Sequence, residues 1–291
     1  MELSVSNSAF YSQNFEDVLL ARCFSQVEHG FYIDVGAQDP EIDSVTRYFY
    51  DKGWSGINIE PVTEFAEAFK SRKRDLTICC AAGSEEEIIP MSITLENGLS
   101  TFNPENAANI KELGFQIEKR NIQIRSLDSI LEDFGIARTA FEFLKIDVEG
   151  YELNVIKGFD LNRYRPKIIL CEVTKPNTST KTKEFVPLCR AIESYGYHRL
   201  HFDGLNQWWC LSDLKDEFAK HFELPPGALD SGLITPYGGT SARKKILDLA
   251  KKLDESNQKL EEATLKLDAI YRSRSWKITR VLRHFTSVFN F

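Results

Sequence analysis

The sequence predicts an α/β protein with a doubly wound, mostly parallel sheet, followed by a helical extension at the C-terminus. The first observation is an alternation of strand-like and helix-like segments, which begins at Phe31 and continues for about 55 residues. The second is that acidic residues follow buried strand-like runs, as in IDVG and KIDVEG. The third is a change after residue 226, where the alternation gives way to a Gly/Pro-rich stretch and then to a heptad pattern.

The N-terminal half supplies the alternation. We expect Ser12 to cap a helix that continues through Phe24, and we expect the next helix to stop at Gly53, a common C-terminal residue of helices. Runs rich in β-branched and aromatic residues predict the strands between the helices. In order, these segments are the strand FYIDV, the helix SVTRYFYDK, the strand WSGINIE, the helix TEFAEAFKSR and the strand LTICCAA.

The second half continues the same pattern after a looser section. EEIIPMSIT is expected to add a strand pair, and SLDSILEDFG a helix with Ser126 or Asp128 near its cap. FEFLKIDVEG and PKIILCEVT are apolar enough to be buried strands, and the helix YELNVIKGF separates them. The remaining segments are the helix KEFVPLCRAIESYG, the strand YHRLHFDG and NQWWCLS, which we expect to be the last strand, at the edge of the sheet.

Four regions follow from these patterns: a catalytic domain over 1–226, a Gly/Pro-rich linker over 227–242, an amphipathic helix over 243–272 and a basic, aromatic tail over 273–291. Apolar residues at alternating steps of three and four predict a coiled coil that joins copies of the chain; the alternative is a solvated helix that packs on its own domain. The tail suits an anionic membrane surface or a partner groove, with a docked or unstructured terminus as the alternative.

Charge and composition exclude several functional classes. The formal net charge of −7 argues against nucleic acid as a partner, although residues 241–291 hold 12 Lys/Arg against 6 Asp/Glu. The six cysteines form no C-x-x-C pair, so we expect no zinc site, and we interpret them as reduced core residues. The N-terminus lacks a signal-peptide pattern, and no apolar run approaches the roughly 20 residues of a membrane-spanning helix. These features predict a cytoplasmic protein, soluble or peripheral.

Ligands of doubly wound sheets bind outside the carboxyl ends of the strands, so residues that end strands are the candidates for a binding site. Asp34, Gly36 and Ala37 form a turn after the first strand, where glycine permits a close approach of the ligand. Glu60 ends the second strand, and its carboxylate can accept hydrogen bonds from both ribose hydroxyls of an adenosine cofactor. Ala82 lies in the corresponding turn after the third strand.

The first turn decides between two adenosine cofactors. A dinucleotide needs a pyrophosphate cradle of the form G-x-G-x-x-G, but Gln38 and Glu41 occupy its second and third glycine positions. The acidic turn suits S-adenosylmethionine better, because this cofactor has no phosphate and carries a positive sulfonium. A nicotinamide-dependent sugar enzyme remains a weaker alternative.

Asp147 and Glu149 in KIDVEG are the main catalytic candidates, as general base or as acceptor-binding groups. They could instead cap the helix that begins near Tyr151, or hold a divalent cation that binds two acceptor oxygens. His201 is a further candidate base, with a simple hydrogen-bonded strand histidine as the alternative. Ser100 is a plausible loop contact to the cofactor, or else a turn cap.

Several blocks of the chain resemble, in order, the FkbM family of S-adenosylmethionine-dependent methyltransferases. They are FYIDVGAQDP, SVTRYFYDKGWSGINIEP, NGLSTFNP, FLKIDVEGYELNVIKGFD, RPKIILCEV and HFDGLNQWW, which together cover about residues 11–215. The family commonly has Asn where this chain has Gln38. The resemblance implies a Rossmann-like methyltransferase fold and O-methylation of a sugar or glycan-linked acceptor in bacterial surface-polysaccharide synthesis.

The C-terminal segment SRSWKITRVLR is similar to segments in enzymes of bacterial polysaccharide assembly, which agrees with such a setting. The alternative from another functional class is a degenerate methyltransferase fold that serves as an assembly module, with the coiled coil organising a polysaccharide-synthesis complex. Retention of Asp34, Gly36, Glu60 and Asp147 favours the enzyme.

Overall fold

The computed structural model describes residues 9–95, 100–112, 114–136, 139–175, 178–227, 230, 256, 259–260 and 263–266. The chain divides into two compact units, residues 1–241 and 242–291. In the second unit the described residues are helical and exposed. The predicted linker and coiled coil lie largely outside the described residues, and the predicted tail lies wholly outside them.

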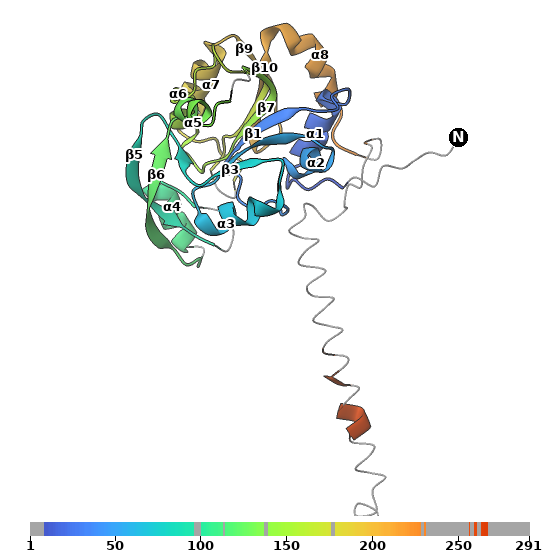
Figure 1. Cartoon of the computed structure of the whole chain (residues 1–291), viewed down its shortest axis with the longest axis vertical. Helices are drawn as coiled ribbons and strands as arrows, with labels where there is room; N and C mark the ends of the chain where they lie inside the picture. The colour runs from blue at the N-terminus through green and yellow to red at the C-terminus, as the bar shows by residue number, and fades with distance from the viewer. Residues whose placement is uncertain are drawn as a thin grey trace, which may run out of the picture. The chain divides into compact units, whose positions relative to one another are not determined.

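A seven-stranded sheet forms the centre of the first unit, in the order β3-β2-β1-β7-β8-β10-β9 (Figure 1). The first five strands in this order are parallel, whereas β10 runs antiparallel to both of its neighbours. The order reverses between β1 and β7, which is the topological switch point of such a sheet. The strands are β1 (Phe31–Val35), β2 (Ser55–Ile59), β3 (Leu76–Ile78), β7 (Ala140–Ile146), β8 (Arg165–Glu172), β9 (Tyr197–Phe202) and β10 (Asn206–Leu211).

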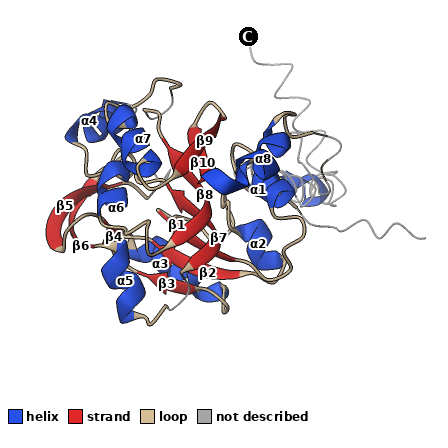
Figure 2. Ribbon diagram, turned by 90° about the horizontal axis from the view of Figure 1, so that it is seen from above, coloured by secondary structure: helices blue, strands red, loops and turns tan. Residues whose placement is uncertain are grey.

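Helices cover both faces of this sheet (Figure 2), which confirms the predicted doubly wound architecture. On one face, buried side chains of three helices pack with those of the strands in the larger core. These helices are α5 (Leu127–Asp133), α6 (Glu152–Lys157) and α7 (Phe185–Glu193). On the other face, an aromatic-rich core joins the sheet to three helices. They are α1 (Glu16–Cys23), α2 (Arg47–Asp51) and α8 (Lys215–Ala219).

A smaller sheet of order β4-β6-β5 lies beside the main one, with its own core around Met91, Ile93 and Ile124. The prediction of one strand over LTICCAA was wrong, because the chain passes from β3 in the large sheet to β4 in the small one. EEIIPMSIT forms one strand and not a pair. The elements of this region are α3 (Thr63–Ala68), β4 (Ala81–Ala82), β5 (Glu87–Ile93), α4 (Pro104–Glu112) and β6 (Glu118–Arg125).

Two further predictions need correction. NQWWCLS is not the edge strand, because β10 lies between β8 and β9, and this interior position fully buries Trp208 and Trp209. Ser12 is not the N-cap residue of the first helix, because that helix begins at Glu16 and Phe15 precedes it. The Ser12 hydroxyl still accepts the N–H of Asp17 in the first turn at 3.3 Å, and it donates to the Asp17 carboxylate at 2.6 Å. The predicted cap at Ser126 is confirmed, since its hydroxyl accepts the backbone N–H of Ser129 at 3.0 Å.

Short 3-10 turns complete the described body at Phe69–Ser71, Ser212–Leu214 and Lys220–Phe222. No helix within the described ranges combines the length and the apolar character needed to cross a bilayer.

Candidate active site

A cavity of about 500 Å³ lies at the carboxyl ends of β1, β2, β7 and β8, at the switch point of the sheet. Residues that end or follow these strands line it, and loops from the small sheet and from the segment before α1 complete the wall. Eight of the predicted site residues line this cavity: Asp34, Gly36, Ala37, Glu60, Ala82, Ser100, Asp147 and Glu149.

Gly36 is required by the neighbouring strand. Its φ of +78° lies in the left-handed region, and a Cβ atom there would lie 1.8 Å from the carbonyl oxygen of Asp147. The Gly36 N–H donates to the carbonyl of Ile59 at 2.9 Å, so the turn is fixed to β2 as well. The single glycine of the turn therefore lets three strand ends meet.

Glu60 anchors the turn through Gln38. Gln38 also has a positive φ, +52°, and its N–H donates to Oε2 of Glu60 at 2.9 Å. The other carboxylate oxygen accepts the N–H of Val62 at 2.8 Å. Burial raises the pKa of Glu60 to about 7. Each oxygen keeps a lone pair for a further donor, such as a ribose hydroxyl.

Asp34 is bound from within the protein on both oxygens. Oδ1 lies 3.1 Å from Nζ of Lys145, and Oδ2 accepts the hydroxyl hydrogen of Thr46 at 3.2 Å. Burial raises the pKa of Asp34, and the charge of Lys145 opposes this change. The fully buried carboxylate is thus held in place beside the turn after β1.

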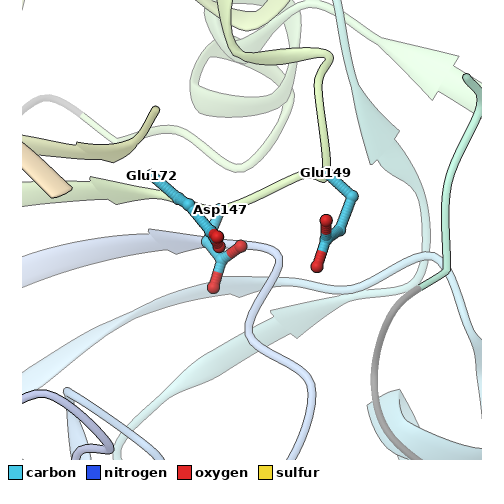
Figure 3. Close-up of side chains that lie close together, drawn as sticks. All are labelled: Asp147, Glu149 and Glu172. Atoms are coloured by element: carbon cyan, nitrogen blue, oxygen red, sulfur yellow. The ribbon is translucent and has the colours of Figure 1, made fainter. Parts of the chain in front are cut away.

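Three acids converge at the cavity: Asp147, Glu149 and Glu172 (Figure 3). One carboxylate oxygen of each lies within 4.8 Å of the others. Glu149 reaches this position because its φ of +52° turns the chain out of the strand, and its carbonyl accepts hydrogen bonds from Thr101 and Asn106, both at 2.9 Å. Burial, together with the charge of Asp147, raises the pKa of Glu149 and of Glu172.

The same three carboxylates are the group among the described residues that could hold a metal ion. Oxygen ligands of this kind suit Mg²⁺ or Ca²⁺. The three acids can therefore act in either of two ways: a carboxylate can accept a proton, or the carboxylates can together hold a divalent cation that binds acceptor oxygens.

Ser100 and the two alanines have supporting positions. The Ser100 hydroxyl accepts the N–H of Thr94 at 3.1 Å and donates to the Thr94 carbonyl at 3.3 Å, so it closes the loop after β5. Ala37 and Ala82 are buried, and their small side chains leave room in the cavity wall.

His201 is placed elsewhere, on the edge strand β9, and it is not among the described residues that line the cavity. Its ring packs on Phe222, with 5.2 Å between ring centroids. This position does not support the predicted role of His201 as a base.

Two further residues line the cavity: Lys145, which the sequence-based candidates did not include, and Glu172, which ends β8 and had no predicted role. A signal for Lys145 was present. It is the one cation in the apolar run FEFLKI, and strand alternation places it on the same face as Asp147, two residues later.

S-adenosylmethionine fits the groups that line the cavity. Glu60 can accept ribose hydroxyls, while Val62, Phe65, Met91 and Phe102 supply apolar surface for a purine. The acidic residues tolerate the positive sulfonium that this cofactor carries.

Comparison with known proteins agrees with this reading of the site. The family model "Methyltransferase FkbM domain" matches residues 34–199, more than half of the 291 residues. No curated protein matches the chain.

Among solved structures, the chain is similar to a methyltransferase FkbM from Methylobacillus flagellatus, with 17% identity and a TM-score of 0.42 over 63% of this chain and 44% of that one. Less than half of that protein is therefore spanned. Another similar structure is an O-methyltransferase from Bacillus cereus in complex with S-adenosylhomocysteine, with 10% identity and a TM-score of 0.31 over 70% of this chain and 82% of that one. These likenesses are too distant to carry an argument about function.

The family match carries the identification, because it includes the turn at Asp34, the second-strand acid Glu60 and the acids Asp147 and Glu149. Membership of this family supports S-adenosylmethionine as the cofactor and methyl transfer as the reaction. The chain belongs to the FkbM family of methyltransferases.

Proposed function

We propose that the protein transfers the methyl group of S-adenosylmethionine to a hydroxyl group of a sugar or glycan-linked acceptor. The observation that carries this proposal is the convergence of Asp147, Glu149 and Glu172 on the cavity that also contains the turn at Gly36 and Glu60. The same cavity thus contains groups that suit an adenosine cofactor and carboxylates that can accept hydroxyl hydrogens.

The acids have two tasks in methyl transfer to oxygen. They hold the attacking oxygen about 3 Å from the methyl carbon, in line with the bond that breaks. They also remove the hydroxyl proton, for which a carboxylate in the cavity is a suitable base. We assign the base to Asp147 or Glu149 and the binding of further acceptor hydroxyls to the other acids. S-adenosylmethionine supplies the electrophilic methyl group when it is bound.

Polyhydroxylated acceptors agree with this wall of the cavity. Three carboxylates can accept several hydroxyl hydrogens at once, and the exposed Thr178 and Ser179 add hydroxyl groups at the edge of the cavity. The FkbM membership and the similarity of SRSWKITRVLR to polysaccharide-assembly enzymes support a role in bacterial surface-polysaccharide or glycan synthesis.

We further propose that the enzyme acts in the cytoplasm, at the inner face of the membrane. In this proposal residues 243–272 join copies of the chain, and residues 273–291 contact anionic lipid or polysaccharide-assembly proteins. The heptad pattern and the basic, aromatic composition support it. Sedimentation and liposome flotation of the full chain, compared with a chain that ends at residue 242, test both contacts.

The catalytic proposal is tested in two steps. Calorimetry first measures S-adenosylhomocysteine binding by the wild type and by Glu60→Gln, which we expect to bind more weakly. A panel of free sugars, nucleotide sugars and lipid-linked glycans is then incubated with isotopically labelled S-adenosylmethionine, and labelled products are identified by mass spectrometry. Absence of cofactor binding by the folded wild type would contradict the proposal and favour the assembly-module alternative.

A further inference from the structure

We propose that Lys145 is a positioning residue that ties the cofactor turn to Asp147 and thereby sets the cofactor against the catalytic acids. This inference rests on the proposed methyl transfer. It concerns a largely buried residue that lines the cavity and has no assigned role in binding the cofactor or the acceptor.

Three contacts of the Lys145 ammonium carry the inference. Nζ donates a hydrogen bond to the carbonyl of Gly36 at 2.8 Å, lies 3.1 Å from Oδ1 of Asp34 and lies 3.5 Å from Oδ2 of Asp147. The first two partners belong to the cofactor turn, and the third is a candidate base. One ammonium group therefore contacts both halves of the site.

The register of the sheet makes this link local and rigid. Lys145 on β7 pairs directly with Asp34 on β1, and Asp147 follows directly after the last residue of β7. The backbone N–H of Asp147 also donates to the carbonyl of Val35 at 2.9 Å. Movement of the lysine would thus displace the ends of both β1 and β7.

The charges around Lys145 leave it little freedom. Burial disfavours the ammonium, but the carboxylates of Asp34 and Asp147 hold the pKa of Lys145 above its usual value. Among the described residues that line the cavity, it is the single Lys, Arg or His. The second oxygen of Asp34 is bound to Thr46, whose hydroxyl accepts a hydrogen bond from buried Arg72 at 2.8 Å. Asp34 is therefore held from both sides and cannot easily follow a displaced lysine.

Loss of the ammonium has two separable effects on ligands. The turn loses its donor to Gly36, which weakens binding of any ligand that uses the turn. Asp147 loses its nearby positive charge, which strengthens attraction for a ligand that carries a positive charge in the cavity. S-adenosylmethionine carries a sulfonium, whereas S-adenosylhomocysteine is uncharged at sulfur, so the two ligands report on the two effects separately.

The experiment is calorimetric titration of the full chain with both ligands. The variants are Lys145→Met, Lys145→Arg, Asp147→Asn and the doubles that combine each lysine change with Asp147→Asn. The control is Lys167→Met, which removes a lysine of β8 whose Nζ lies 3.4 Å from Glu142, and which does not line the cavity.

For Lys145→Met we expect S-adenosylhomocysteine to bind about tenfold to a hundredfold more weakly, as for loss of a hydrogen bond that involves a charged group. The binding of S-adenosylmethionine should weaken clearly less. This difference between the ligands should become smaller in the double variant with Asp147→Asn, because part of the effect acts through that carboxylate and the rest through Asp34. Lys145→Arg keeps the charge but changes its position, so it should alter the preference between the two ligands while its circular dichroism spectrum stays native. Lys167→Met should bind both ligands as the wild type does.

Equal weakening of both ligands in Lys145→Met, independent of Asp147, would overturn the inference, because it would indicate a structural role. So would wild-type affinity for S-adenosylhomocysteine. If Lys145→Met does not fold, Lys145→Arg decides: a wild-type preference between the two ligands overturns the inference, and an altered preference that becomes smaller with Asp147→Asn supports it. Failure of the wild type to bind either ligand would instead defeat the proposed function.

Discussion

Replacement of Gly36 by alanine should both destabilise the protein and weaken its binding of the cofactor. The new Cβ would lie 1.8 Å from the Asp147 carbonyl oxygen, so the strand ends must separate. The left-handed φ of +78° costs an alanine about 1–2 kcal/mol, and forced overpacking adds about 1–3 kcal/mol. We expect a loss of about 2–5 kcal/mol in the free energy of unfolding, measured by urea denaturation, and S-adenosylhomocysteine affinity at least about tenfold lower by calorimetry.

Gly135→Ala is the matched control. Gly135 also has a positive φ, +62°, but a Cβ atom there would meet nothing within 4 Å. Gly135→Ala should therefore lower the free energy of unfolding only through the left-handed backbone conformation, by about 1–2 kcal/mol, and should leave the ligand affinity unchanged. If Gly36→Ala were no less stable than Gly135→Ala and bound S-adenosylhomocysteine normally, the close contact with Asp147 would not exist as described.

Three other predictions follow from the same geometry. His201→Ala should keep methyl transfer to the acceptor found in the panel, whereas Asp147→Asn or Glu149→Gln should lower kcat by about a hundredfold or more; a large loss in His201→Ala would contradict the site. Burial, reinforced by the charge of Asp203, raises the pKa of Glu16 from 4.5 to about 7. The folded protein then holds a proton that the unfolded chain releases, so the free energy of unfolding should fall as pH rises between these two values. Urea denaturation across that pH range should show that the free energy of unfolding falls less steeply with pH in Glu16→Gln than in the wild type. An identical slope in both proteins would refute the raised pKa of Glu16. Chelation of divalent cations with EDTA should leave S-adenosylhomocysteine affinity unchanged, because we assign the three acids to the acceptor and not to the cofactor; weaker binding in calorimetry would contradict that assignment.

The residues of the cofactor turn could be predicted because parallel strands bring their carboxyl ends to one edge of the sheet. Asp34, Gly36 and Glu60 each end or follow a strand that was recognisable from its apolar run. The reason for Gly36 was different from the expected one, however. The sequence suggested close approach of a ligand, and the structure shows close approach of the Asp147 backbone.

Other parts of the site depend on contacts between segments that are distant in the sequence. Glu149 joins Asp147 and Glu172 because Thr101 and Asn106 bind its carbonyl and hold a left-handed turn, which no local pattern of β7 indicates. The interior position of β10 likewise follows from pairing with both β8 and β9. Strand alternation alone predicts faces of a strand, and it cannot predict neighbours in the sheet.

The central claim is that one cavity holds S-adenosylmethionine between the Gly36 turn and the three acids. A crystal structure of the protein with S-adenosylhomocysteine tests it most directly. We predict that the ribose hydroxyls lie at Glu60 and that the sulfur faces the space bounded by Asp147, Glu149 and Glu172. A ligand bound outside this cavity, or a sulfur directed away from all three acids, would contradict the account.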